Sequence, residues 1–130
     1  MESNLITIKK ITPVFKDERG EIFDIFEAPV GHTGLITFTQ GAARAGHYHI
    51  ESIQYSYVLE GEIELIVSQQ DGSEEERFTL KPNMYAEIPA GVVHTYIAKT
   101  EALMLDSTTL SRNGDGYEKD TVRVPVETVK

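Results

Sequence analysis

The chain has 130 residues, and 12 Lys and Arg residues against 21 Asp and Glu residues give it a formal net charge of −9. This length fits one domain of ordinary size, and a hydrophobic fraction of 40% is too high for a disordered protein. The negative charge argues against nucleic acid and anionic membranes as partners, because both attract basic surfaces. Cysteine is absent, which excludes disulfides and thiolate metal sites.

Short segments with β-like patterning recur between turn residues along the chain. Val, Ile and Thr outnumber Leu and Ala, and such branched side chains favour strands over helices. The predicted strands are residues 5–11, 21–27, 34–40, 54–59, 62–68, 77–80, 84–88, 95–98 and 103–109. No helical periodicity lies between them. Nine short, closely spaced strands predict an all-β sandwich or barrel.

We expect residues 1–130 to form a single domain in which residues 110–130 are a C-terminal tail. In this tail Val122, Val124 and Val126 alternate, which suits either an edge strand or a dimer arm. The N-terminus lacks the basic start and apolar run of a signal peptide. No apolar stretch approaches the roughly 20 residues needed to span a bilayer. We therefore expect a cytoplasmic protein.

Two of the four histidines stand close together in a glycine-flanked segment, residues 41–61. On an extended strand, His47 and His49 project from the same face, so their imidazoles can converge on one point. Gln54 would face the other way on an unbroken strand. A turn at residues 50–52 would bring its side chain back to the same pocket.

A second segment, residues 83–98, carries a third histidine. Pro89 and Gly91 form a tight Pro-Ala-Gly turn. His94 then opens the next strand. Tyr96 follows His94 at a spacing of two, and we therefore expect its side chain to line the same pocket.

These two segments resemble the two motifs of the cupin superfamily, G-x5-H-x-H-x4-E-x6-G and G-x5-P-x-G-x2-H-x3-N. The positions that match are Gly41, His47, His49, Gly61, Pro89, Gly91 and His94. The positions that differ are Gln54 for the glutamate, Asn83 for the second glycine and Ala98 for the asparagine. The resemblance covers residues 41–61 and 83–98, and the strand-rich remainder suits a cupin.

The resemblance implies a cupin double-stranded β-helix, which is a jelly-roll barrel open at one end. It also implies metal ligands, namely His47, His49, Gln54 and His94. Three imidazoles and an amide carbonyl suit Zn, Fe, Ni, Mn or Cu, and the ligand types do not choose among these divalent metals. The alternative is a metal-free barrel whose histidines transfer protons or only fill the pocket.

A weaker resemblance points to cupins that act on nucleotide-linked sugars. The stretch Asp17-Glu18-Arg19-Gly20 is similar to the opening strand of sugar-nucleotide 3,4-ketoisomerases and 3,5-epimerases and of capsular-polysaccharide cupin domains. Arg44 stands three residues before His47, as in the ketoisomerases, and a glutamine follows the histidine pair at the ketoisomerase spacing. The likeness implies that His47 and His49 are acid/base groups that work without metal, a role that suits imidazole near neutral pH. It also implies catalytic and phosphate-binding roles for Arg44, with Arg19 as a second phosphate-binding residue.

The fourth histidine, His32, lies outside both motifs, and we expect it to be a surface residue of a loop. The favoured function is a metal-binding cupin that isomerises or epimerises a (nucleotide-linked) sugar in surface-polysaccharide biosynthesis. The alternatives are a metal-dependent dioxygenase or lyase on a small organic acid, and a non-catalytic module that binds a small ligand. We also expect a homodimer, paired through residues 5–11 or 122–126, because exposed sheet edges are usually covered.

Overall fold

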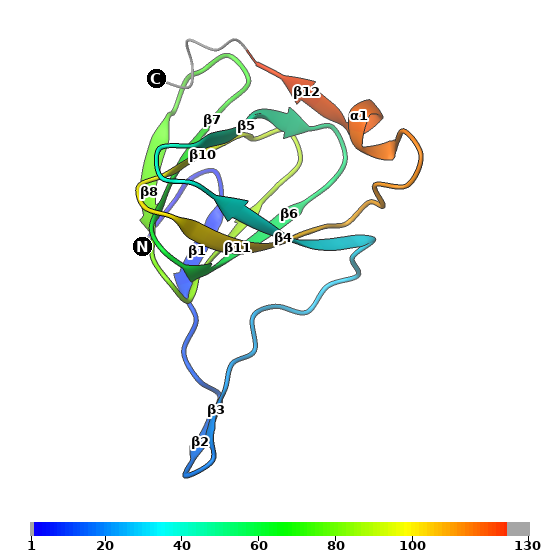
Figure 1. Cartoon of the computed structure of the whole chain (residues 1–130). Coiled ribbons are helices and arrows are strands. Elements are labelled where there is room, and N and C mark those ends of the chain that lie inside the picture. Colours follow the sequence, from blue (N-terminus) through cyan, green and yellow to red (C-terminus); the bar gives the residue numbers. More distant parts are fainter. Residues whose placement is uncertain (1, 125–130) are drawn as a thin grey trace.

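Two five-stranded antiparallel sheets face each other in the computed structural model, which describes residues 2–124 (Figure 1). The first sheet has the order β1 (Thr7–Lys10), β9 (Met84–Ile88), β6 (Gln54–Glu60), β11 (Ala102–Thr108) and β4 (His32–Phe38). The second has the order β12 (Thr121–Arg123), β5 (Ala43–His49), β10 (Val93–Ala98), β7 (Ile63–Ser68) and β8 (Glu76–Leu80). This is the jelly-roll barrel, and the all-β prediction is confirmed.

The hydrophobic core lies between the inner faces of the two sheets. Strand alternation places one set of side chains there, because successive residues of a strand point to opposite faces. The fully buried members include Val58, Ile63, Leu65, Val67, Leu80 and Met104. The same alternation continues toward one end of the barrel, where histidine, glutamine and aspartate replace the apolar residues.

The prediction of a strand over residues 21–27 is wrong beyond Ile22. The strand β3 (Gly20–Ile22) pairs only with β2 (Phe15–Asp17), and the following residues adopt no regular structure. Their apolar side chains cover the outer face of the first sheet instead. Phe26 stacks on Tyr55 with ring centroids 4.5 Å apart. The alternating pattern thus reflects contact with a sheet face and not pairing with a strand edge.

The strand β5 was not among the nine predicted strands, because residues 41–46 carry the signals of a turn. Ala45 and Gly46 do have positive φ angles, 73° and 74°. They form an irregularity inside the strand: His94 pairs with His47, the next residue of β10 pairs with Ala45, and Gly46 has no partner in this register. Such a bulge re-aims the side chains that follow it.

The C-terminal tail contains a short helix, α1 (Gly116–Asp120), that the sequence did not predict, because one turn is too short to show a period. The edge-strand interpretation is confirmed for β12, which pairs with β5. Val126 lies outside the described residues. Within the part of the chain that is described, no helix has the length and apolar character to cross a membrane.

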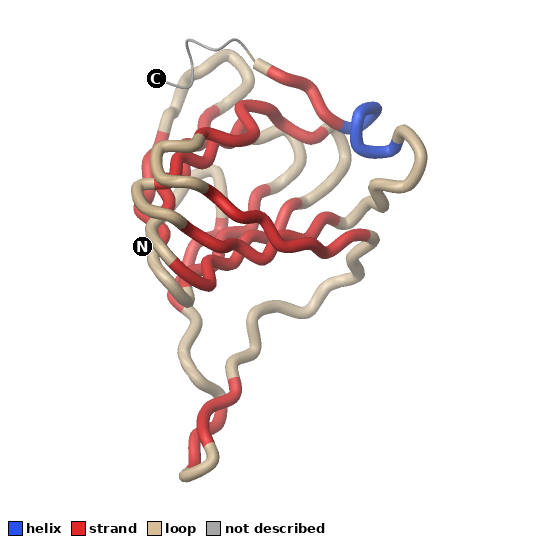
Figure 2. The backbone as a smooth tube through the Cα atoms, in the orientation of Figure 1, coloured by secondary structure: helices blue, strands red, loops and turns tan. Residues whose placement is uncertain are grey.

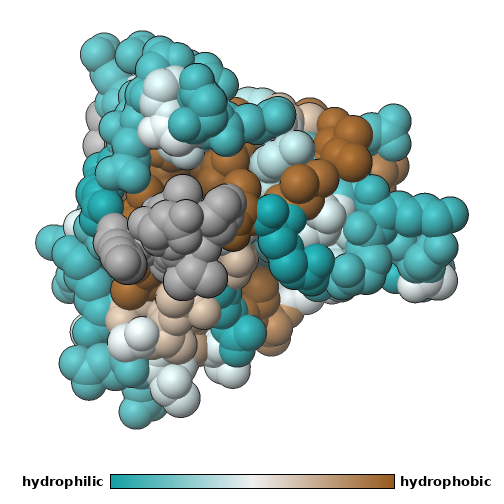
Figure 3. Space-filling view, turned by 90° about the horizontal axis from the view of Figure 1, so that it is seen from above, coloured by the Kyte–Doolittle hydropathy of each residue, from teal (hydrophilic) through white to brown (hydrophobic). Residues whose placement is uncertain are grey.

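The hairpin of β2 and β3 projects away from the barrel, at the end opposite α1 and β12 (Figures 1 and 2). Three apolar residues on this hairpin and beside it are exposed: Val14 at 62%, Phe15 at 49% and Ile22 at 55%. The face seen from above is largely hydrophilic, as expected for a charge of −9, with hydrophobic side chains between the polar ones (Figure 3).

Candidate active site

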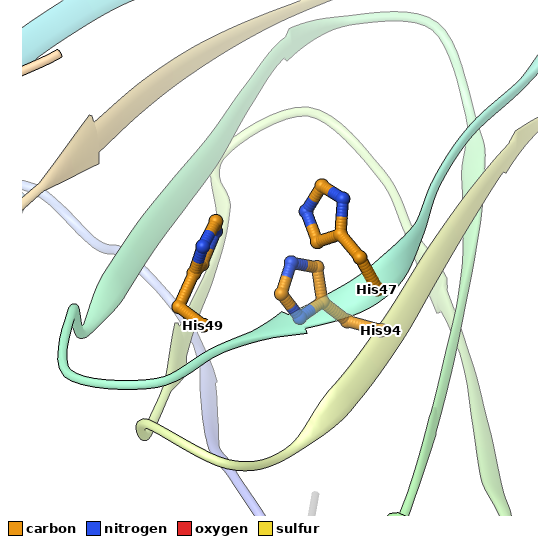
Figure 4. Close-up of side chains that lie close together, drawn as sticks. All are labelled: His47, His49 and His94. Atoms are coloured by element: carbon orange, nitrogen blue, oxygen red, sulfur yellow. The ribbon is translucent and has the colours of Figure 1, made fainter. Parts of the chain in front are cut away.

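Three imidazole rings meet inside the barrel (Figure 4). His47 and His49 come from β5, and His94 comes from β10. The ring centroid of His47 lies 4.8 Å from those of the other two, which are 5.4 Å apart. All three residues are buried, and one ring nitrogen from each lies within 4.8 Å of the others. The motif histidines are thus brought together as the sequence predicted.

The hydrogen bonds of His94 leave one of its nitrogens with a free lone pair. Its Nδ1 lies 3.1 Å from the carbonyl oxygen of Val92. A carbonyl oxygen can only accept, so Nδ1 carries the proton and Nε2 carries the lone pair. Nε2 is buried and has no hydrogen-bond partner among residues 2–124. It is the nitrogen that His94 offers to a proton or a metal ion.

His49 has an acceptor at each of its ring nitrogens. Nε2 lies 2.9 Å from Oε1 of Gln54, which a bend after β5 brings back into the site. Nδ1 lies 3.6 Å from Oδ2 of Asp120. A turn near residues 50–52 does therefore return Gln54 to the pocket. A proton on either ring nitrogen of His49 would therefore face an oxygen atom.

A buried carboxylate is linked to the histidines through Gln54. Asp106, on β11, is 1% exposed. Its Oδ1 accepts hydrogen bonds from Nε2 of Gln54 at 2.8 Å and from Oγ of Ser56 at 3.0 Å. The hydroxyl of Tyr96 lies 2.6 Å from the Ser56 hydroxyl. Burial raises the pKa of Asp106 to about 6, although the bonds from Gln54 and Ser56 oppose that rise.

Burial keeps all three imidazoles neutral near pH 7. It lowers the pKa of His47 to about 4, and the neighbouring His49 adds to that effect. Burial also lowers the pKa of His49, against the opposing influence of Gln54 and Asp120. The pKa of His94 lies well below its ordinary value, again through burial first. Neutral imidazoles can accept protons, which is the state that a general base needs.

A cavity of about 220 Å³ opens beside His47. Two arginines line it, and each lies over an aromatic ring: Arg44 is 5.4 Å from the ring centroid of Phe38, and Arg112 is 4.5 Å from that of Tyr117. The remaining lining residues are Ile36, Ala45, Gln54, Tyr96 and Asp106. The cavity is therefore lined by two cations together with polar and apolar side chains.

The other two residues singled out from the sequence lie elsewhere. Arg19 is at the turn of the β2–β3 hairpin, where its guanidinium pairs with Asp17 at 2.7 Å. It is not among the residues that line the cavity beside His47. His32 opens β4 and is half-buried, so it is not the surface loop residue that we expected. Its ring lies against Gly34 of the same strand.

Four residues of the site were missed at the level of sequence: Asp106, Arg112, Tyr117 and Asp120. A signal existed for Asp106, because it shares the inward face of a predicted apolar strand with Met104. A lone carboxylate in that position is unusual unless it is partnered. No signal marked the other three, which belong to the tail and reach the site through α1 and the loop before it.

The fold and the site define the class of protein. The family model for the cupin domain matches residues 34–108, which is more than half of the chain, and the chain belongs to this family. A search of curated proteins gave no match.

Solved structures with the same fold include several enzymes of sugar nucleotides. QdtA, a sugar 3,4-ketoisomerase from Thermoanaerobacterium thermosaccharolyticum solved with TDP, matches with a TM-score of 0.76 and 17% identity over 97% of this chain and 93% of that one. The dTDP-4-dehydrorhamnose 3,5-epimerase of Sulfolobus tokodaii matches with a TM-score of 0.76 and 16% identity, over 96% of this chain and 80% of that one. ChmJ, a 3'-monoepimerase from Streptomyces bikiniensis solved with dTDP-quinovose, matches with a TM-score of 0.78 and 17% identity, over 95% of this chain and 73% of that one. At these identities the likeness shows the fold.

The three histidines could hold a divalent metal ion. Three imidazole nitrogens are a common donor set for such ions, and the lone pair of His94 is available. The surroundings of His49 Nε2 do not fit a metal ligand, because the oxygen of Gln54 lies 2.9 Å away and favours a proton there, whereas a ligand nitrogen must be deprotonated. Metal binding at Nε2 would therefore require a His49 ring with no proton on Nε2 and a Gln54 side chain that turns its carbonyl toward the ion.

Proposed function

We propose that this protein is an isomerase or epimerase of a keto sugar carried on a nucleotide, with His47 as the group that moves a carbon-bound proton. The observation that carries the proposal is a neutral, buried imidazole at the wall of the cavity, in contact with the rings of His94 and His49. His94 offers a lone pair on Nε2, and His49 lies beside the carboxylate of Asp120. The fold shared with sugar-nucleotide isomerases and epimerases supports the same substrate class.

The chemistry requires removal of a proton from a carbon next to a keto group. His47 takes this proton, and the electron pair of the C–H bond moves into the carbonyl to give an enediolate. Return of the proton to the neighbouring carbon gives the isomer, and return to the opposite face of the same carbon gives the epimer. As the isomer forms, the neighbouring hydroxyl becomes the new carbonyl and releases its proton to water, while the old carbonyl oxygen gains a proton from water. The electron pair stays within the sugar, so no oxidant or reductant is needed. The carboxylate of Asp120, next to His49, stabilises the positive charge that develops on His47 and His49 when the proton is taken up.

Arg44 and Arg112 supply the affinity for the nucleotide. The protein as a whole repels anions, but both guanidinium groups lie at the cavity and are held against aromatic rings. A guanidinium fork matches a phosphate oxygen pair. We propose that these two residues bind the diphosphate. A phosphate-binding role for Arg19 and a place in surface-polysaccharide synthesis stay predictions.

Incubation with TDP-4-keto-6-deoxyglucose in D₂O, in the presence of a chelator, tests the proposal. The expected result is deuterium at a carbon next to the keto group, followed by proton NMR, with the product identifying isomerisation or epimerisation. The nucleotide-linked sugar should also raise the Tm, whereas the free sugar should not. Absence of both exchange and a Tm shift at millimolar ligand would overturn the proposal.

A metal-dependent oxygenase or lyase is the second candidate, and the observation that favours it is the Nε2 of His94, which has no hydrogen-bond partner within residues 2–124. Elemental analysis of protein purified without chelator separates the two. Near-stoichiometric metal that is lost in His47→Ala and His94→Ala would support the second candidate. Metal-free protein that retains proton exchange would support the first.

A further inference from the structure

Two acceptors compete for the proton of the neutral His49 ring. Gln54 presents Oε1 to Nε2 at 2.9 Å, and Asp120 presents Oδ2 to Nδ1 at 3.6 Å. The hydroxyl of Thr121, 3.4 Å from Nδ1, is already held 2.6 Å from the carbonyl oxygen of Tyr117. A neutral imidazole has one N–H, so only one nitrogen can donate. The carboxylate of Asp120 favours a proton on Nδ1, whereas the Gln54 carbonyl favours one on Nε2.

The choice depends on which way the amide of Gln54 points. An amide can turn to exchange its oxygen and nitrogen, and it would then donate to Nε2 of His49. Asp106 prevents this, because its Oδ1 lies 2.8 Å from the Gln54 nitrogen and can only accept there. A turned amide would place its carbonyl oxygen against this carboxylate. Both Gln54 and Asp106 are buried, at 4% and 1% exposure, so such a contact would be costly.

The neighbouring hydroxyls agree with this direction. The Ser56 hydroxyl donates its one proton to the same Oδ1 at 3.0 Å. The Tyr96 hydroxyl, 2.6 Å from the Ser56 oxygen, must therefore donate to Ser56. The second N–H of Gln54 then reaches the oxygen of Tyr96 at 3.2 Å. Every donor in the network has an acceptor in this one arrangement. Oδ1 accepts whether Asp106 is ionised or carries a proton on its other oxygen.

We propose that Asp106 is a positioning residue, which acts through Gln54 to keep a proton on Nε2 of His49. The triad then contains two imidazoles of opposite kind, His49 with an N–H and His94 with a lone pair on Nε2. His47 forms the third corner of this triangle, with its ring centroid 4.8 Å from each of the other two. A catalytic role for this difference between His49 and His94 rests on the proposed function. The position of the proton on His49 does not depend on that function.

The ring nitrogens of the histidines report the proton directly. In long-range ¹H–¹⁵N NMR spectra, a nitrogen that carries a proton is separated widely from one that carries a lone pair. His49 of the metal-free protein at pH 7 should show a protonated Nε2, with its signals assigned by their loss in His49→Asn. An unprotonated Nε2 in the unsubstituted protein would overturn the proposal without any variant of Asp106.

Asp106→Leu removes the acceptor and frees the amide. Tyr96 can then donate to Gln54, the amide nitrogen can face His49, and Asp120 draws the proton to Nδ1. The expected result is loss of the protonated Nε2 signal. If the leucine variant does not fold, Asp106→Asn gives the same result, because Arg112, 3.8 Å from Oδ2, favours the Asn carbonyl on its side.

Two controls separate positioning from general disturbance of the site. Ser56→Ala removes another hydrogen bond to the same oxygen, and Asp120→Asn removes a carboxylate on the other side of the ring. Both should keep Nε2 protonated. An unchanged His49 in the folded Asp106 variants, or an equal change in Ser56→Ala, would overturn the proposal. Failure of proton exchange on the sugar nucleotide would instead overturn the proposed function and leave the NMR result standing.

Discussion

The guanidinium carbon of Arg112 lies 4.5 Å from the ring centroid of Tyr117, and one of its nitrogens lies 3.8 Å from Oδ2 of Asp106. The aromatic ring holds the cation in place, while the buried carboxylate attracts it. Asp106 offers Arg112 no hydrogen bond at this distance. Arg112 therefore keeps its N–H groups available to an anionic ligand in the cavity.

Replacement of Arg112 or Arg44 should weaken binding of the nucleotide. Arg112→Gln and Arg44→Gln are each expected to raise the Kd for TDP about tenfold or more, because each removes charge-assisted hydrogen bonds to phosphate. Isothermal titration calorimetry measures the change. Arg77→Gln on β8 removes the same charge outside the cavity and serves as the control. Equal effects of all three substitutions would indicate net charge alone and contradict a local phosphate site.

Replacement of His47 should abolish proton exchange while leaving nucleotide binding in place. His47→Asn removes the base at the cavity wall, and loss of general base catalysis typically costs about 10²–10⁴ in rate. Deuterium incorporation into the sugar measures the rate, and the Tm shift by TDP measures binding. His32→Asn is the control, because His32 does not line this cavity. Proton exchange that is retained in His47→Asn would show that another residue is the base.

The fold and the histidine triad were predictable because both depend on local spacing. Alternation along a strand sets which of His47 and His49 face inward, and the motif spacing brings His94 to them. Asp106, Arg112 and Asp120 were not predictable in the same way. Their places depend on register between strands and on a loop and one-turn helix in the tail, where the sequence has no period to follow. The hydrogen-bond direction at Gln54 likewise follows only from its three-dimensional partners.

Acidification should destabilise the metal-free protein through His47. Its pKa is about 4 in the folded protein and near 6.5 when unfolded. Between these values the unfolded chain binds a proton that the folded protein does not, so stability falls as pH decreases from 6.5 to 4. Asp106, with its raised pKa, acts in the opposite direction. The Tm of His47→Gln should therefore fall less steeply than that of the unsubstituted protein over this window. Parallel Tm profiles would contradict the lowered pKa.

Gly61 of the first motif should tolerate no side chain. Its φ is +82°, and a Cβ there would lie 2.2 Å from the carbonyl oxygen of Glu101. Gly72 has a similar φ of +86° but open space around the same position. Gly72→Ala should thus cost only the strain of a positive φ, about 1–2 kcal/mol, whereas Gly61→Ala adds a backbone clash. Urea denaturation measures both. Equal losses would show that the backbone near Glu101 moves aside.

The homodimer stays a prediction, and the projecting β2–β3 hairpin gives it a testable surface. Phe15 and Ile22 pair across the hairpin and are 49% and 55% exposed, with Val14 beside them at 62%. An exposed apolar hairpin is a common point of contact between subunits. Phe15→Ser combined with Ile22→Ser should convert a dimer to a monomer in sedimentation velocity, with little change in Tm measured on the monomer. The matched control is Lys16→Ser combined with Glu21→Ser, because these two residues form the next register pair of the same hairpin. A monomeric unsubstituted protein, or a dimer that survives the apolar substitutions, would exclude this hairpin as the interface.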